Sequence, residues 1–74
     1  DFNAVAQDLA SVPDVLGVHN LHIWELSPGH VALTAHMELR TLERWPVLRV
    51  QLQDLLRTKH GIDHATIQPE ITPN

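Results

Sequence analysis

The chain has 74 residues, of which five are Lys or Arg, nine are Asp or Glu and none is Cys, and its formal net charge is −4. A chain of this length forms one small domain whose single core is barely sufficient for stability. Without cysteine there are no disulfides and no thiolate metal sites, so any metal would be held by nitrogen and oxygen atoms. The acidic balance and the lack of a basic cluster argue against nucleic acid as a partner. No apolar run is long enough to span a bilayer.

The first twelve residues carry the periodicity of an amphipathic helix. Apolar residues recur on one arc at 3.6-residue spacing from residue 2 to residue 12. Those residues are Phe2, Val5, Ala6, Leu9 and Val12. Pro13 cannot continue a helix, so we expect the helix to end there.

Residues 15 to 39 are typical of a β-hairpin. The first half is rich in β-branched and aromatic residues, Leu26-Ser27-Pro28-Gly29 is a turn signal, and the second half alternates apolar and polar residues. A four-residue turn pairs Glu25 with His30. That register places His19 opposite His36, where the two Cβ atoms lie about 4.5–5.5 Å apart.

The last third of the chain predicts a second helix and a third strand. Pro46 suits a first helical turn, the leucines at 48, 52, 55 and 56 form an apolar stripe, and Gly61 is a C-terminal stop. Residues 64–70 alternate as a strand, and residues 71–74 are expected to form a tail. The order of helix, strand, strand, helix and strand predicts an α+β fold, a two-layer αββαβ sandwich in which both helices cover one face of a three-stranded sheet.

The hairpin register assigns the side chains to two faces of the sheet. The face toward the helices is expected to carry Val18, Trp24, Val31, Leu33, Ala35 and Met37, with His22 among them. The open face is expected to carry Leu21, Ile23 and Ala32 beside His19 and His36. In the third strand Thr66, Gln68 and Glu70 fall on the open face. An apolar open face usually marks an interface, so we expect a homodimer there.

Six histidines make metal binding the first functional hypothesis, because neutral imidazole is a common zinc ligand. His19 and His36, with the Glu70 carboxylate and a water, fit tetrahedral zinc. His22 is either a hydrogen-bonded structural histidine or a ligand, and His64 either caps the strand or ligates. His30 and His60 are expected to be solvated, with His60 complementing the helix dipole.

Three segments together carry a family resemblance. They are Val18-His19-Asn20-Leu21-His22-Ile23-Trp24, then Leu33-Thr34-Ala35-His36, then Gly61-Ile62-Asp63-His64-Ala65-Thr66-Ile67-Gln68-Pro69-Glu70. In this combination the chain resembles the C-terminal cytoplasmic domain of cation diffusion facilitators, proton-coupled exporters of zinc and related divalent ions. The resemblance spans residues 3–70. It implies a metallochaperone-like, ferredoxin-like domain that dimerises below the transmembrane domain of the same chain, at the cytoplasmic face of a membrane.

The resemblance also implies which residues bind metal. The family positions, a histidine on each of the first two strands and an acidic residue ending the third, match His19, His36 and Glu70. Some members hold a second ion through a histidine of the third strand, where this chain has Gln68 and so departs from that pattern. His22 and His64 match strongly patterned positions and are further candidates. The ion expected first is Zn²⁺, and Co²⁺, Ni²⁺, Cu²⁺ and Cd²⁺ suit the same donors.

Three functions compete at this stage. The first is a metal-sensing and dimerisation domain, residues 1–74, excised from a longer membrane transporter of divalent cations. The second is a free-standing soluble metal carrier. The third is a zinc hydrolase using His19, His36 and Glu70 with an activated water. No general base in a closed pocket is evident and the chain leaves little room for a substrate cleft, so we expect no enzyme activity and no catalytic residue.

Overall fold

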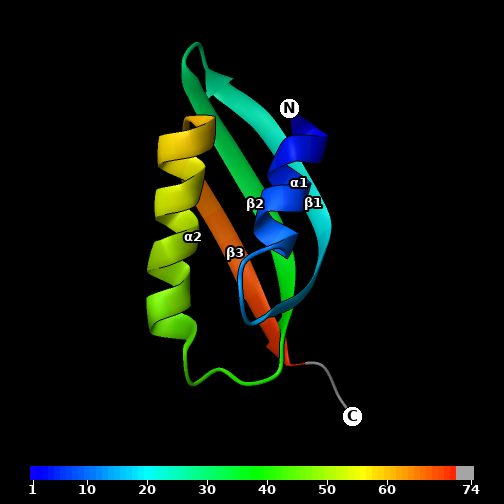
Figure 1. The fold of residues 1–74 in the computed structure, drawn as a ribbon. Coiled ribbons are helices and arrows are strands. Elements are labelled where there is room, and N and C mark those ends of the chain that lie inside the picture. The colour runs from blue at the N-terminus through cyan, green and yellow to red at the C-terminus, as the bar shows by residue number, and fades with distance from the viewer. Residues whose placement is uncertain (72–74) are drawn as a thin grey trace.

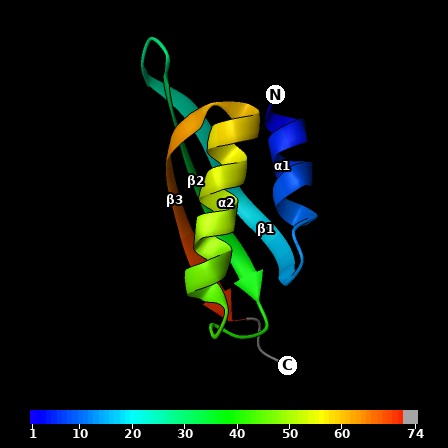
Figure 2. The ribbon, with the colours of Figure 1, turned by 60° about the vertical axis from the view of Figure 1, so that its left-hand side comes forward.

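Two helices and three strands make up the described part of the chain. The computed structural model describes residues 1–71, and its elements are α1 (Phe2–Ala10), β1 (Val15–Ser27), β2 (His30–Leu39), α2 (Trp45–His60) and β3 (Ile62–Ile71). The strands form one layer, and both helices lie on the same face of it (Figures 1 and 2). The predicted α+β two-layer sandwich is confirmed. No helix among the described residues is long and apolar enough to cross a membrane.

Local capping explains where the helices begin and end. The Asp1 side chain accepts hydrogen bonds from the backbone amides of Asn3 and Ala4 at 2.8 and 3.3 Å, which satisfies two free donors of the first turn of α1. Helix α1 stops at Ala10, two residues before the predicted end. Gly61 ends α2 in the left-handed conformation, with φ of 67°, a geometry that glycine adopts without steric cost.

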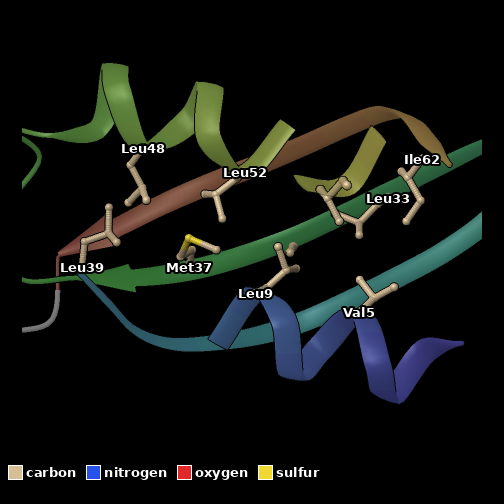
Figure 3. Close-up of a cluster of buried hydrophobic side chains, with 10 residues drawn as sticks. Val5, Leu9, Leu33, Met37, Leu39, Leu48, Leu52 and Ile62 are labelled. Carbon is tan, nitrogen blue, oxygen red and sulfur yellow. The ribbon is translucent and has the colours of Figure 1, made fainter. Parts of the chain in front are cut away.

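The core lies between the helices and the sheet. Leu9 of α1, Leu52 of α2 and Met37 of β2 meet there with no exposed surface (Figure 3). The other core residues are Val5, Leu33, Ala35, Leu39, Leu48, Leu56 and Ile62. Since the opposite face of the sheet is covered by neither helix, polar side chains on that open face remain accessible.

The sheet has strand order β1-β2-β3, with β1 and β2 antiparallel and β2 and β3 parallel. Helix α2 is the crossover that a parallel pair requires. Strand β2 is central, so a residue of β2 has neighbours from both other strands. His36 lies between His19 and Gln68, and Glu38 pairs with Glu70.

Asn20 introduces a β-bulge that changes the faces of the residues after it. His19 pairs with His36 as predicted, but the next partners are His22 and Thr34, so β1 advances three residues while β2 advances two. Asn20 has φ of 53°, a left-handed conformation in which asparagine is enriched. The residues from 21 to 25 are therefore shifted by one position relative to the prediction.

Because of the bulge, four side chains lie on the opposite face of the sheet from the one predicted. Leu21 and Ile23 pack against the core rather than lying on the open face. His22 is exposed on the open face, not among apolar residues, and Trp24 is 44% exposed, not a core residue. Trp24, not Ile23, pairs with Ala32, which is buried at 5% exposure.

The predicted turn and the start of the third strand also need correction. Ser27, not Glu25, pairs with His30, which leaves a two-residue turn whose Gly29 has φ of 82°. Strand β3 begins at Ile62, two residues before the predicted start, and includes Ile71, which was assigned to the tail. The rest of that predicted tail, residues 72–74, lies outside the described residues.

Candidate metal centre

Each of the three strands contributes one side chain to a cluster on the open face. His19 of β1 and His36 of β2 are directly paired, and their ring centroids lie 5.4 Å apart with the planes tilted by 40°. Glu70 follows Gln68, the β3 partner of His36, by two residues and so lies on the same face. The three predicted residues therefore come together in the folded chain.

The Glu70 carboxylate lies between the two imidazoles. Its Oε2 atom is 2.7 Å from Nδ1 of His36, and its Oε1 atom is 3.2 Å from Nε2 of His19. The three side chains are between 33% and 40% exposed. A small ion in solvent can reach them directly.

The electrostatic environment favours an ionised carboxylate at Glu70. The hydrogen bond from His36 lowers the pKa of Glu70 below its ordinary value, and the charges of His36 and His19 act in the same direction, while partial desolvation opposes them. A divalent cation needs an ionised carboxylate and unprotonated ring nitrogens, so it would take the place of the protons that the imidazoles donate to Glu70.

The donor set fits a divalent cation. One atom from each of His19, His36 and Glu70 can be chosen so that all three lie within 4.8 Å of one another, and these residues form the one such group in residues 1–71. Zinc is held by imidazole nitrogen and carboxylate oxygen at about 2.0–2.2 Å. With three protein donors, a water molecule would complete tetrahedral coordination.

Two further polar residues, Gln68 and Glu38, contact members of the cluster. The Gln68 amide lies 3.4 Å from Oε2 of Glu70 and is placed to donate a hydrogen bond to it. Glu38, which is not among the residues predicted to bind metal, lies with its Oε1 atom 3.4 Å from Nδ1 of His19. The available signal was its spacing, because Glu38 follows His36 by two residues on an alternating strand.

The remaining candidate ligands lie outside the group of three. His22 lines an open hollow of about 340 Å³ that also borders His36 and Gln68. His64 is exposed on β3 and pairs with Ala32, six residues before Glu70. Neither imidazole joins the three clustered side chains.

Of the two histidines expected to be solvated, His30 is exposed and His60 is not. The His30 side chain is 59% exposed, with its Nδ1 atom 3.4 Å from the Asp63 carboxylate. The His60 side chain is only 11% exposed, and its Nε2 atom lies 2.6 Å from the carboxylate of Asp8. The prediction of a solvated His60 is wrong because α1 packs beside the end of α2 and supplies a carboxylate there.

Three of the similar proteins are named for cation efflux or zinc transport. The chain is 36% identical over 75 residues to the metal cation efflux system protein CzcD of Cupriavidus metallidurans, covering 99% of this chain and 23% of that protein. It is 36% identical to the vacuolar zinc transporter TgZnT of Toxoplasma gondii, covering 97% of this chain and 8% of that protein. It is 31% identical to the mouse proton-coupled zinc antiporter SLC30A1, covering 95% of this chain and 14% of that protein.

A solved structure and a family model match nearly the whole chain. The metal-bound C-terminal domain of the CzcD transporter superposes with a TM-score of 0.86 at 34% identity, covering 95% of this chain and 97% of that domain. The model of the cation efflux protein cytoplasmic domain matches residues 1–72. The chain thus spans a quarter or less of the length of the transporters named above and nearly all of the one excised domain. This chain belongs to the family of cytoplasmic domains of cation efflux proteins, the cation diffusion facilitators.

Proposed function

We propose that this chain is the metal-sensing and dimerising domain of a divalent-cation exporter, and that it binds zinc through His19, His36 and Glu70. The observation that carries the proposal is the convergence of these side chains, from three strands, on one accessible face. Family membership and a solved relative described as metal-bound support it. Zinc is the proposed ion because two relatives are named as zinc transporters and because the donors suit it. Cobalt, nickel, copper and cadmium ions suit the same donors.

The domain would act from the cytoplasmic face of a membrane as part of a longer, proton-coupled transporter. The support is the small share of each relative that the chain covers, which is 23% of CzcD and 14% of the mouse antiporter. Residues 1–74 would then form one regulatory unit whose partner is the transmembrane domain of the same chain. Ion transport itself would require that domain.

Metal binding would report on the ion concentration by changing how two copies of the domain associate. The open face of each copy carries the Glu70 carboxylate and its two imidazoles. A bound cation offsets like charges where two such faces approach, and so favours the closer arrangement. The resulting change in the dimer would be the signal passed to the transmembrane domain.

The test is calorimetric titration of the chain with zinc. We expect His19→Ala, His36→Ala and Glu70→Gln each to weaken the principal site by more than about 100-fold, since loss of a direct ligand exceeds the 10–100-fold cost of losing a supporting residue. His30→Ala is the matched control, because His30 is exposed and paired with Asp63 away from the cluster. The zinc affinity of His30→Ala should match that of the wild type.

Acid should release the metal, because protonated imidazole cannot ligate. The lowered pKa of Glu70 keeps its carboxylate ionised on acidification, so the histidines limit binding. Unchanged zinc affinity in both His19→Ala and His36→Ala would overturn the assignment. An equal loss in His30→Ala would indicate binding that is not confined to the cluster.

A further inference from the structure

We infer that Glu38 is a positioning residue that orients His19 toward the metal, an inference that rests on the proposed function. The two ring nitrogens of His19 face different carboxylates. Nε2 lies 3.2 Å from Oε1 of Glu70, whereas Nδ1 lies 3.4 Å from Oε1 of Glu38. Nε2 is therefore the nitrogen on the side of the candidate metal, and Nδ1 is turned toward Glu38.

The strand pairing places the Glu38 carboxylate beside His19. Glu38 pairs with Gly17, which precedes His19 by two residues on the same face of β1. The Glu38 carboxyl group lies over Gly17, with Cδ and Oε2 each 3.7 Å from the position that a Cβ atom would occupy, which is an ordinary contact distance. A large side chain at position 17 would occupy that space. Glu38 is outside the group of mutually close donors, so it supports a ligand rather than acting as one.

The chemical consequence is control of the His19 tautomer. When Nδ1–H donates to the Glu38 carboxylate, the lone pair of Nε2 is left for the metal. The side chain of His19 is 40% exposed, so packing alone does not fix the ring. The contact with Glu38 would therefore hold the His19 ring in one orientation, as close packing would in a buried site.

The first experiment compares zinc affinity among carboxylate variants. We expect Glu38→Ala to weaken zinc binding by about 10–100-fold. Glu38→Gln should recover part of that loss, because its amide oxygen still accepts from Nδ1. Glu25→Ala is the matched control, because it removes the same charge from an exposed position six residues beyond His19 on β1. All three variants should keep the melting temperature close to that of the wild type.

A double-mutant cycle distinguishes positioning from an independent contribution to binding. If Glu38 acts through His19, then adding Glu38→Ala to His19→Ala should weaken the residual zinc affinity no further. Additive losses would show that Glu38 binds or attracts the metal directly, and would overturn the inference. Nitrogen-15 NMR of the zinc-loaded chain should show a protonated Nδ1 and a zinc-bound Nε2 at His19. Zinc on Nδ1 would also overturn it.

The outcomes separate this inference from the proposed function. Zinc binding that requires His19 but is unaffected by Glu38→Ala would overturn the positioning role alone. If the wild-type chain bound no zinc, or bound it independently of His19, the proposed function would fail and the positioning role would fail with it.

Discussion

A single residue, Asn20, decides which side chains of β1 face the core. The left-handed conformation at Asn20 adds one residue to β1 relative to β2, so the side chains from Leu21 to Glu25 lie on the opposite face from that predicted. Leu21 and Ile23 should therefore contribute to the stability of the fold. His22 and Trp24 are instead exposed to solvent and to ligands.

Substitution at two adjacent positions tests the bulge. His22→Ala should change the free energy of unfolding by no more than about 0.5 kcal/mol, because the side chain is exposed. Ile23→Ala should destabilise the domain by about 1–2 kcal/mol, below the range for a fully buried isoleucine, because Ile23 is only partly buried against the core. Chemical denaturation of the metal-free chain measures both values. A larger loss of stability in His22→Ala than in Ile23→Ala would contradict the bulge. It would indicate that His22 lies on the face toward the helices.

At the scale of elements, α1 packs against β1 and is joined to α2 through Asp8. It has only nine residues, and an isolated helix of that length is not stable in water. Besides the apolar contacts of Val5 and Leu9, it is held by Asp8, whose carboxylate lies 2.6 Å from Nε2 of His60 and 3.0 Å from Nζ of Lys59. The hydrogen bond from His60, followed by that from Lys59, lowers the pKa of Asp8.

The lowered pKa of Asp8 predicts a pH-dependent contribution to stability. A carboxylate whose pKa is lower in the folded chain stabilises it above the ordinary value, here 3.8, and loses that effect as pH falls through the folded value. Asp8→Asn should thus lower the melting temperature by a few degrees at neutral pH. The difference from the wild type should shrink below pH 3.8, as thermal melts followed by circular dichroism would show.

Asp54→Asn is the matched control for Asp8→Asn. Asp54 pairs with Arg57 one turn away in the same helix, and both side chains are more than half exposed. Exposed pairs of this kind contribute little to stability, so the melting temperature should stay close to that of the wild type. Equal effects of Asp8→Asn and Asp54→Asn would mean that the contact between α1 and α2 has no special weight.

At the scale of the whole molecule, charge is distributed unevenly. The basic residues all lie between positions 40 and 59, namely Arg40, Arg44, Arg49, Arg57 and Lys59. The open face of the sheet instead carries Glu38 and Glu70 among its histidines, with Trp24 as an exposed aromatic side chain. A cation bound on that face would reduce repulsion between two copies, and Trp24 would supply apolar contact area.

The proposed homodimer can be tested by substituting Trp24, which the structure places on the open face of the sheet. Light scattering with zinc present should give a mass near twice 8.3 kDa, and Trp24→Asp should shift the chain toward the monomer. Val50→Asp is the control, because Val50 is 52% exposed on α2, away from the open face. A wild-type monomer at high concentration with zinc would contradict the dimer. Ile23→Asp is unsuitable, because Ile23 packs against the core and the variant would unfold.

The sequence by itself determined the order of the elements and the three clustered side chains. Periodicity identified both helices, Gly61 marked the end of α2, and the opposition of His19 and His36 was predicted from the hairpin. That pairing is correct although the turn from which it was deduced is not. The two-residue turn displaces the register by two residues, and the irregularities between Glu25 and Ser27 and at Asn20 each shift it back by one. These features depend on local backbone preferences and on short-range spacing, which the sequence contains directly.

Only the tertiary structure decided the faces of Leu21 to Trp24, the burial of His60 and the neighbours of His19. Asparagine is compatible with a left-handed conformation but does not require it, so the bulge depends on how well either register packs against α1 and α2. The contact between Asp8 and His60 joins residues 52 positions apart. The contact between Glu38 and His19 requires β1 and β2 to be paired. Such contacts exist only when distant segments are brought together, because their energy depends on geometry that spacing along the chain does not specify.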